Sequence, residues 1–81
     1  MRLEGKVVRD HVGPRFSPDD NPEARLRLTG LPIQPPDGPE IQEIDLQKYF
    51  PWRMSFECQK VDGEWAWGVQ EGSMRIHTDS P

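Results

Sequence analysis

The clearest hydrophobic pattern in the chain lies between residues 52 and 78, where apolar and polar residues alternate in three short segments. Alternation with a period of two is typical of β-strands, because successive side chains of a strand point to opposite faces. Asp62-Gly63 and Glu71-Gly72 separate the three segments, and dipeptides of this kind are typical of tight hairpin turns. The pattern therefore predicts a C-terminal meander of three antiparallel strands.

The two turns also predict how these strands pair. If Asp62-Gly63 is the first loop, Phe56 lies opposite Val69. The second turn places Trp67 opposite Ile76. Both pairings put the large apolar residues of the meander on one face, namely Met54, Phe56, Cys58, Trp65, Trp67 and Val69. We expect this face to lie in the core, with Trp67 as the most buried indole.

The other face of the meander is polar and supplies a first candidate binding surface. Its polar side chains are those of Ser55, Glu57, Gln59, Arg75 and His77, and the last four are the candidate binding residues. The middle strand contributes only Ala66 and Gly68 to this face, so long side chains from the flanking strands have room to meet. A surface ion pair is the simplest interpretation of such an arrangement, and acid-base chemistry by Glu57 with His77 is a less favoured one.

The N-terminal part of the chain predicts one strand and one capped turn. Residues 2–9 place Leu3 and Val7 on one face with Gly5 between them, and a glycine inside a strand often marks a bulge. Residues 16–23 combine a Ser-Pro start with an acidic residue three positions after the serine, as at a helix N-terminus. This segment lacks the glycine and the distal glutamate of a calcium loop, so it predicts a capped turn and no metal site.

The middle of the chain predicts two further strands joined by a proline-rich connection. Residues 24–30 alternate, with Leu26 and Leu28 pointing inward and the arginines and Thr29 outward. Residues 31–39 contain four prolines in two PxxP spacings, which we interpret as a stiff, extended connection with use as a peptide ligand less favoured. Residues 43–48 predict a strand, with a short helical turn as the alternative.

Three aromatic residues within four positions follow this segment, namely Tyr49, Phe50 and Trp52 around Pro51. Proline cannot donate a hydrogen bond to a β-ladder, so these four residues are predicted to form a corner between strands. In the simpler interpretation, the aromatic rings cover one open end of the fold. If Tyr49 or Trp52 is exposed, it is the natural anchor for a protein partner.

The chain has 81 residues, which suits one domain; we expect it to span residues 1–78, with a frayed tail over 79–81. Short alternating segments, turn signals and almost no helix signal predict an all-β fold. We expect a small five- or six-stranded antiparallel barrel or sandwich, OB-like or SH3-like. Only 33% of the residues are hydrophobic while three are Trp and three Phe, so a few aromatic side chains must supply much of the core.

The residue inventory excludes several kinds of chemistry. One cysteine cannot form an internal disulfide, and Cys58 is expected to be a buried, inert thiol. No metal-ligand spacing, phosphate loop or nucleophile-base pair occurs, so we expect no metal, no cofactor and no enzymatic activity. The start of the chain lacks the apolar run of a signal peptide or membrane span, which predicts no membrane partner and a cytoplasmic location.

The net charge is −4, and the acidic excess lies in residues 36–81. Such a chain lacks the basic footprint typical of nucleic-acid binding. Its basic patch is predicted from Arg2, Lys6, Arg9, Arg25 and Arg27. We therefore expect a module that binds another protein through the aromatic corner or the polar face of the meander. The alternative is an OB-type single-strand nucleic-acid binder, which needs aromatic rings exposed beside cations.

Overall fold

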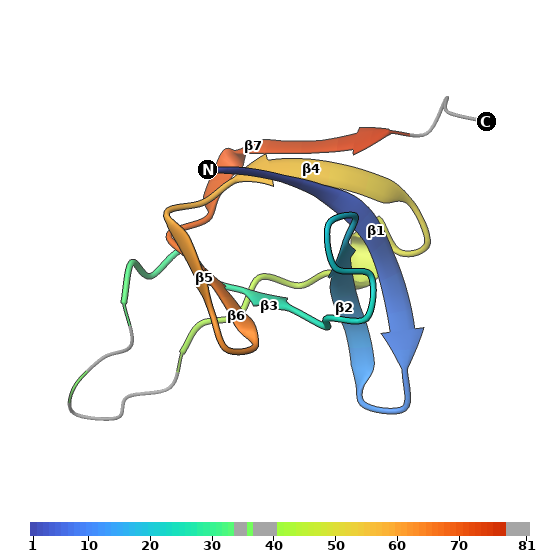
Figure 1. The fold of residues 1–81 in the computed structure, drawn as a ribbon, viewed down its shortest axis with the longest axis horizontal. Coiled ribbons are helices and arrows are strands. Elements are labelled where there is room, and N and C mark those ends of the chain that lie inside the picture. Colours follow the sequence, from blue (N-terminus) through green and yellow to red (C-terminus); the bar gives the residue numbers. More distant parts are fainter. Residues whose placement is uncertain (34–35, 37–40, 78–81) are drawn as a thin grey trace.

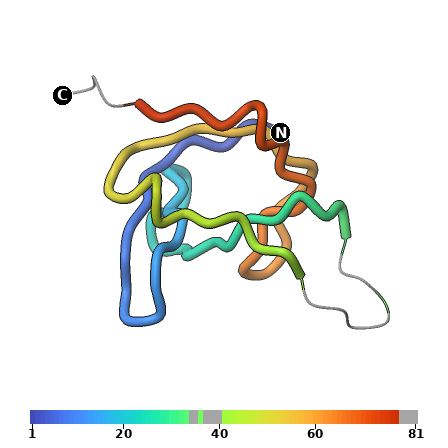
Figure 2. Tube along the Cα trace, turned by 180° about the vertical axis from the view of Figure 1, so that it is seen from behind, coloured from blue at the N-terminus to red at the C-terminus, as the bar shows by residue number. Residues whose placement is uncertain are grey.

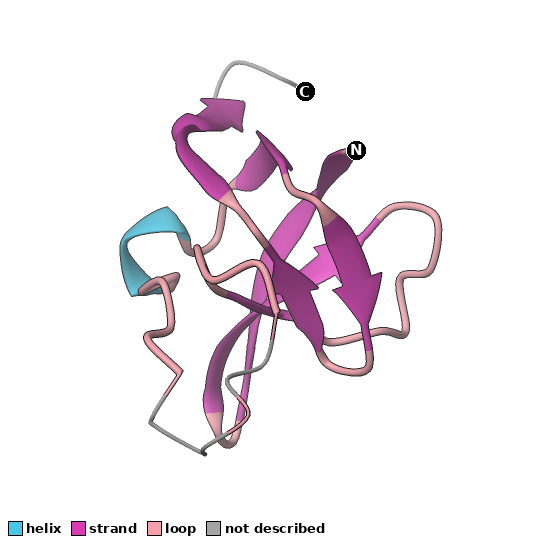
Figure 3. Ribbon diagram, turned by 90° about the vertical axis from the view of Figure 1, so that its left-hand side faces the viewer, coloured by secondary structure: helices cyan, strands magenta, loops and turns pink. Residues whose placement is uncertain are grey.

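The computed structural model describes residues 1–33, 36 and 41–77 and shows an all-β chain, as predicted (Figures 1 and 3). Its strands in the described residues are β1 (Arg2–Asp10), β2 (Gly13–Pro18), β3 (Arg27–Leu28), β4 (Arg53–Glu57), β5 (Lys60–Asp62), β6 (Trp65–Trp67) and β7 (Gln70–His77). One 3₁₀-helix, η1 (Gln47–Tyr49), precedes β4. No α-helix occurs in the part of the chain that the structure describes.

The strands form two sheets that do not close into a barrel. The first sheet has the order β2-β1-β4-β7 and is antiparallel throughout, whereas the second has the order β3-β6-β5 and pairs β3 with β6 in parallel. A bridge between Phe16 of β2 and Leu26, the residue before β3, links the first sheet to the start of the second. The β1–β2 hairpin extends away from the rest of the chain (Figure 2). A wholly antiparallel closed barrel is therefore not what forms.

The β1–β2 hairpin confirms the first predicted strand and overturns the predicted turn after it. Residues 16–18 continue β2, where the sequence predicted a capped helical turn over residues 16–23. Phe16 is fully buried and packs edge-on against Phe56, with 4.9 Å between the ring centroids. Burial of a whole aromatic side chain outweighs a local capping signal, which is worth only about 1 kcal/mol.

Gly5 does not form the predicted bulge. The pairing of β1 with β2 and with β4 continues through Gly5 without a shift in register. A Cβ atom on Gly5 would lie 2.1 Å from the carbonyl oxygen of Ser17 and 2.9 Å from the ring of Phe16. Glycine is required here because the backbone of β2 and the ring of Phe16 pass directly over this position.

The first hairpin of the predicted meander forms with a different loop. Asp62 pairs with Trp65, so the loop is Gly63-Glu64 and the predicted pairing of Phe56 with Val69 is wrong. Gly63 has φ +64°, and no described residue other than glycine has positive φ. A type I′ turn needs positive φ at two central residues, whereas a type II′ turn needs it only at the first, where this loop has its glycine.

The second hairpin of the predicted meander does not form. β7 pairs with β4, where Met54 lies opposite Ile76, so the predicted pairing of Trp67 with Ile76 is also wrong. After β6 the chain bends at Gly68, which has φ +67° and donates its N–H to the carbonyl of Leu31. This bend carries the chain from the second sheet to the first, so the C-terminal strands do not form a simple meander.

The core forms between the sheets and contains Val7, Phe16, Leu26, Leu28, Leu46, Met54, Phe56, Cys58, Ala66 and Val69. The inward positions predicted for Leu26, Leu28, Met54, Phe56, Cys58 and Val69 are thus confirmed. On β6 the faces are reversed, because Ala66 lies in the core cluster while Trp65 and Trp67 lie outside it. Trp67 is nevertheless the most buried indole, as predicted, with 4% of its surface exposed and its ring beside that of Trp65.

The central part of the chain is less regular than predicted. Thr29 was expected to point outward, but it is fully buried and its hydroxyl donates to the carbonyl of Gln42. The strand predicted over residues 43–48 is reduced to a single bridge between Glu43 and Thr29, followed by the turn of η1. Most of the proline-rich connection and the predicted tail over residues 79–81 lie outside the described residues.

Candidate functional site

The β4–β7 pairing brings most of the predicted polar surface together. Arg75 lies opposite Ser55, and Glu57 and His77 belong to the same two strands. β4 and β7 are direct neighbours, without the middle strand that the sequence predicted between them. Gln59 lies apart from them, because its side chain packs over Gly68.

These residues line a pocket of about 270 Å³ on the outer face of the first sheet, which we call the β4–β7 pocket. Its lining is Arg2, Ser55, Phe56, Glu57, Ser73, Arg75 and His77. Alternation along the strand placed Ser55 on this face together with Glu57, as the structure has it. Sequence reasoning did not include Arg2 or Ser73 in this surface, and Arg2 reaches the pocket only because β1 pairs with β4.

Hydrogen bonds fix the floor of the β4–β7 pocket. The Ser55 hydroxyl lies 2.9 Å from Nε2 of His77, and Arg2 donates to the same hydroxyl at 3.4 Å. The Ser73 hydroxyl accepts from the backbone N–H of Glu57 at 2.7 Å and donates to the carbonyl of Gln70 at 2.6 Å. The hydroxyl groups of Ser55 and Ser73 are thus already hydrogen-bonded within the fold. The charged side chains that line the pocket are Arg2, Glu57 and Arg75.

The β4–β7 pocket is lined by charged groups of both signs, because Glu57 lines it together with Arg2 and Arg75. Arg75 donates to the carbonyls of Gly72 and Met74, and no described carboxylate forms an ion pair with it. A guanidinium suits a carboxylate ligand, because charge-assisted hydrogen bonds are the stronger ones. A Ser-His pair also occurs in hydrolases, where a third group orients the histidine. Here Ser55 is only 3% exposed.

The predicted aromatic corner forms a turn before β4, and one of its side chains is exposed. Trp52 keeps 44% of its surface accessible, whereas Tyr49 and Phe50 are half-buried and pack against the core. The Tyr49 hydroxyl lies 3.9 Å from the sulfur of Met74, which ties the corner to β7. The role of these residues as a partner anchor stays a prediction.

A second exposed apolar residue lies near Trp52. Ile76 of β7 keeps 41% of its surface accessible. Trp52 directly precedes Arg53, which lies opposite His77, so Trp52 and Ile76 are at the same end of the first sheet. Met74 lies two residues before Ile76 and therefore on the same face of β7. We call Trp52, Met74 and Ile76 the apolar strip.

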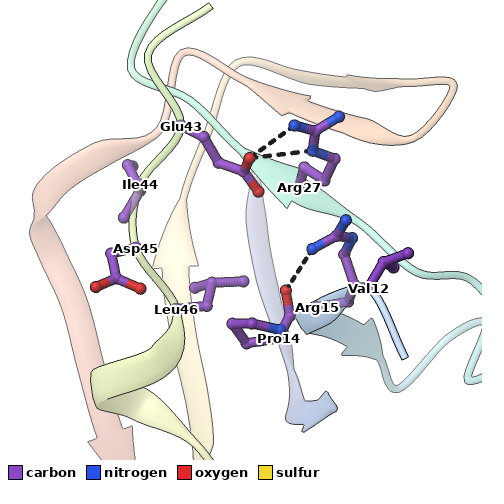
Figure 4. Close-up of a pocket in the computed structure, with 8 residues that line it drawn as sticks. All are labelled: Val12, Pro14, Arg15, Arg27, Glu43, Ile44, Asp45 and Leu46. Atoms are coloured by element: carbon purple, nitrogen blue, oxygen red, sulfur yellow. Dashed lines mark hydrogen bonds and ion pairs between the residues drawn. The ribbon is translucent and has the colours of Figure 1, made fainter. Parts of the chain in front are cut away.

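Arg27 lines a larger pocket, of about 360 Å³, beside the segment that leads to η1 (Figure 4). Arg27 donates from Nε and Nη2 to one carboxylate oxygen of Glu43, at 3.1 and 2.8 Å, and this bond raises the pKa of the guanidinium. The guanidinium also lies 4.4 Å above the ring of Trp65. Through these contacts, Arg27 links β3 to the segment over residues 43–46.

The five cations predicted as a nucleic-acid surface do not form one stripe. Arg27 pairs with Glu43, and Arg25 donates to backbone carbonyls in its own loop. Arg2 belongs to the β4–β7 pocket. Lys6 and Arg9 are both exposed on β1, but an odd spacing places them on opposite faces of the strand.

Three further observations concern the cysteine, metal ligands and membrane spans. Cys58 is buried, and its burial raises the pKa of the thiol. In residues 1–33, 36 and 41–77, no three His, Cys, Asp or Glu side chains gather into a group suited to a metal ion. Within the same residues, no helix has the length and apolar character needed to cross a membrane.

Comparison with known proteins finds no match for this chain among protein-family models, curated proteins or solved structures. Its function must therefore be inferred from its own surfaces.

Proposed function

We propose that the chain is a small non-enzymatic binding module that recognises another protein through the β7 side of its first sheet. The observation that carries this proposal is the joint exposure of Trp52 and Ile76 at one end of that sheet. Large apolar side chains that are exposed side by side are typical of interaction sites, and Trp is enriched among the residues that dominate binding energy.

The β4–β7 pocket supports the same surface. Arg75 and His77 lie on one face of β7, whereas Met74 and Ile76 lie on the other. A partner that contacts β7 therefore meets an apolar face and a polar face that carries the Arg75 guanidinium. We propose that the apolar contacts supply most of the affinity and the contacts with Arg75 supply the selectivity.

The finer fold type belongs to this proposal as well. β4 and β5 are separated by only two residues, yet they belong to different sheets. A segment that passes from one sheet to another through a bend is typical of orthogonally packed sheets and small barrels. This feature supports an open form of an SH3-like or OB-like barrel.

Single-strand nucleic-acid binding is the alternative function, because Trp52 is an exposed ring on which a base could stack. The nearest cation in sequence, Arg53, is already paired with Asp19. We expect no oligonucleotide to bind more tightly than about 10 μM at physiological salt, which is the strength of non-specific binding.

Capture of partners by the immobilised chain tests both functions. The double variant Trp52→Ser, Ile76→Ser removes the two exposed apolar side chains, and Val12→Ser is the matched control because Val12 is 61% exposed on the β1–β2 loop. We expect proteins retained by the wild type and by the control to be lost with the double variant, with little dependence on salt. Loss of one such anchor typically weakens binding by 2 kcal/mol or more, or about 30-fold.

Two results would contradict this function. One is retention of the same proteins by the double variant. The other is sub-micromolar binding of a single-stranded oligonucleotide that falls steeply with salt and is lost in Arg25→Ala, Arg27→Ala. The second result would promote the nucleic-acid alternative.

A further inference from the structure

β7 is the longest free strand edge in the described part of the chain. It is the outer strand of the first sheet, has eight residues, and pairs with no described strand on its other side (Figure 1). The opposite edge strand, β2, is partly covered, because Phe16 and Leu26 exchange two backbone hydrogen bonds. The outer strand of the second sheet, β5, has only three residues.

The backbone groups that face this free edge can be identified from the ladder. The N–H of Val7 in β1 donates to the carbonyl of Trp52, so even-numbered residues along β4 direct their backbone groups to β1. Odd-numbered residues of β4, such as Ser55, then face β7 and pair with Arg75. It follows that Met74 and Ile76 direct their N–H and C=O groups to the open edge.

Arg75 covers part of this edge in the free chain. Its guanidinium donates to the carbonyls of Gly72 at 2.9 Å and Met74 at 3.0 Å. Charged side chains of this kind protect exposed edges from unwanted pairing. A strand that pairs with Met74 must replace Arg75 as the donor to the Met74 carbonyl. The guanidinium then needs another acceptor. A carboxylate is the acceptor that suits a guanidinium best.

We propose, on the basis of the function above, that an extended peptide with alternating acidic and apolar residues adds to β7 as a further antiparallel strand. Its backbone would pair with Met74 and Ile76. Its acidic side chains would lie beside Arg75 and His77, and its apolar side chains would lie beside Met74 and Ile76. Both faces of β7 then have a complementary neighbour.

A second copy of this chain is the competing occupant of the edge. In an antiparallel pair centred on Arg75, the two Arg75 side chains lie directly opposite each other, and like charges in opposite positions destabilise a β-pair. In a pair centred on Ser73, Arg75 lies opposite Glu71 of the other copy. The experiments below therefore distinguish an acidic peptide from a second copy.

Titration of the full chain with short synthetic peptides tests this inference. The probe is a capped heptapeptide of alternating valine and glutamate, followed by the amide signals of the chain in a proton-nitrogen NMR spectrum. We expect shifts at Met74 and Ile76, and binding about tenfold weaker or more for the matched valine-lysine peptide.

N-methylation of the probe distinguishes β-pairing from general contact. Valines that share a face with Met74 direct their N–H groups at β7, whereas the glutamate N–H groups point away. Methylation of the valine amides should abolish binding, and methylation of the glutamate amides should leave it nearly unchanged. Equal effects of the two methylations would overturn the inference.

Arg75→Ala tests the selective role of the guanidinium, and Arg25→Ala is its matched control. Arg25 is exposed and donates to the carbonyls three residues and one residue before it, as Arg75 does. We expect Arg75→Ala to weaken the valine-glutamate probe about tenfold and to remove its advantage over a valine-threonine peptide. Arg25→Ala should change neither value, and an equal effect of both variants would overturn the inference.

Failure of this inference is distinguishable from failure of the proposed function. If the probe does not bind while partner capture still depends on Trp52 and Ile76, strand addition is wrong and the binding module stands. If Met74 and Ile76 are protected from exchange without any peptide and the mass in solution is doubled, the occupant is a second copy and the peptide inference is wrong. A third result is that the probe binds while partner capture is unchanged in the Trp52→Ser, Ile76→Ser variant. Strand addition would then stand, and the apolar strip would not be the anchor for the partner.

Discussion

Replacement of Gly5 by alanine tests how closely β2 and the ring of Phe16 pack over β1 at this position. The added Cβ would lie 2.1 Å from the Ser17 carbonyl oxygen, about 0.9 Å closer than the 3.0 Å below which such contacts essentially never occur. It would also lie 2.9 Å from the Phe16 ring and from the Pro18 Cα. Two of these three neighbours are backbone atoms, so a change of rotamer cannot relieve the clash.

The cost of Gly5→Ala follows from this geometry. Overpacking of a core typically costs about 1–3 kcal/mol, and a clash with backbone belongs at the upper end of that range. A domain of 81 residues has a total stability of about 4–12 kcal/mol. We therefore expect Gly5→Ala to reduce the free energy of unfolding by about 3 kcal/mol or more, which urea unfolding followed by Trp fluorescence measures.

Gly72→Ala is the matched control for this measurement. No atom lies within 4 Å of the Cβ that this substitution adds, and the backbone of Gly72 does not have positive φ. Its unfolding free energy should stay within about 0.5 kcal/mol of the wild type. A cost below about 1 kcal/mol for Gly5→Ala would refute the close approach of β2 to β1 at this position.

Three further predictions concern the buried side chains of the second sheet and of the turn before it. Trp67→Ala should cost about 3–5 kcal/mol in urea unfolding, and Trp65→Ala should cost less because Trp65 is only partly buried; the opposite order would show that Trp67 is not the more deeply packed of the two indoles. Cys58 should react slowly with a thiol reagent in the native state and quickly in denaturant, and equal rates would show that it is exposed. Because its folded-state pKa is raised, stability should fall as the pH rises past the ordinary thiol pKa, and this alkaline loss should shrink in Cys58→Ala.

Local alternation identified which residues face the core in most of the chain. Leu26, Leu28, Met54 and Phe56 are all inside as their spacing predicted. Strand pairing was harder, because it depends on where the chain bends. The bend at Gly68 is stabilised by the carbonyl of Leu31, a residue far away in sequence. No local pattern contains that contact.

The candidate site shows the same division between local and long-range information. Arg75 and His77 share a face because they are two residues apart on one strand, which the alternation of the sequence contains. Arg2 joins them only through the pairing of β1 with β4, across more than fifty residues. The edge position of β7 is a property of sheet order, and turn signals alone predicted a different neighbour for it.

Amide hydrogen exchange of the free chain tests most directly whether β7 presents an open edge to a partner. The N–H of Arg75 is directed at β4, whereas the N–H of Met74 is directed at the free edge. We predict that the Arg75 amide exchanges at least about tenfold more slowly than the Met74 amide, because only the former is protected by the ladder. Equal protection of the two amides in the monomeric chain would contradict the open edge, and with it the surface through which we propose that the chain binds its partner.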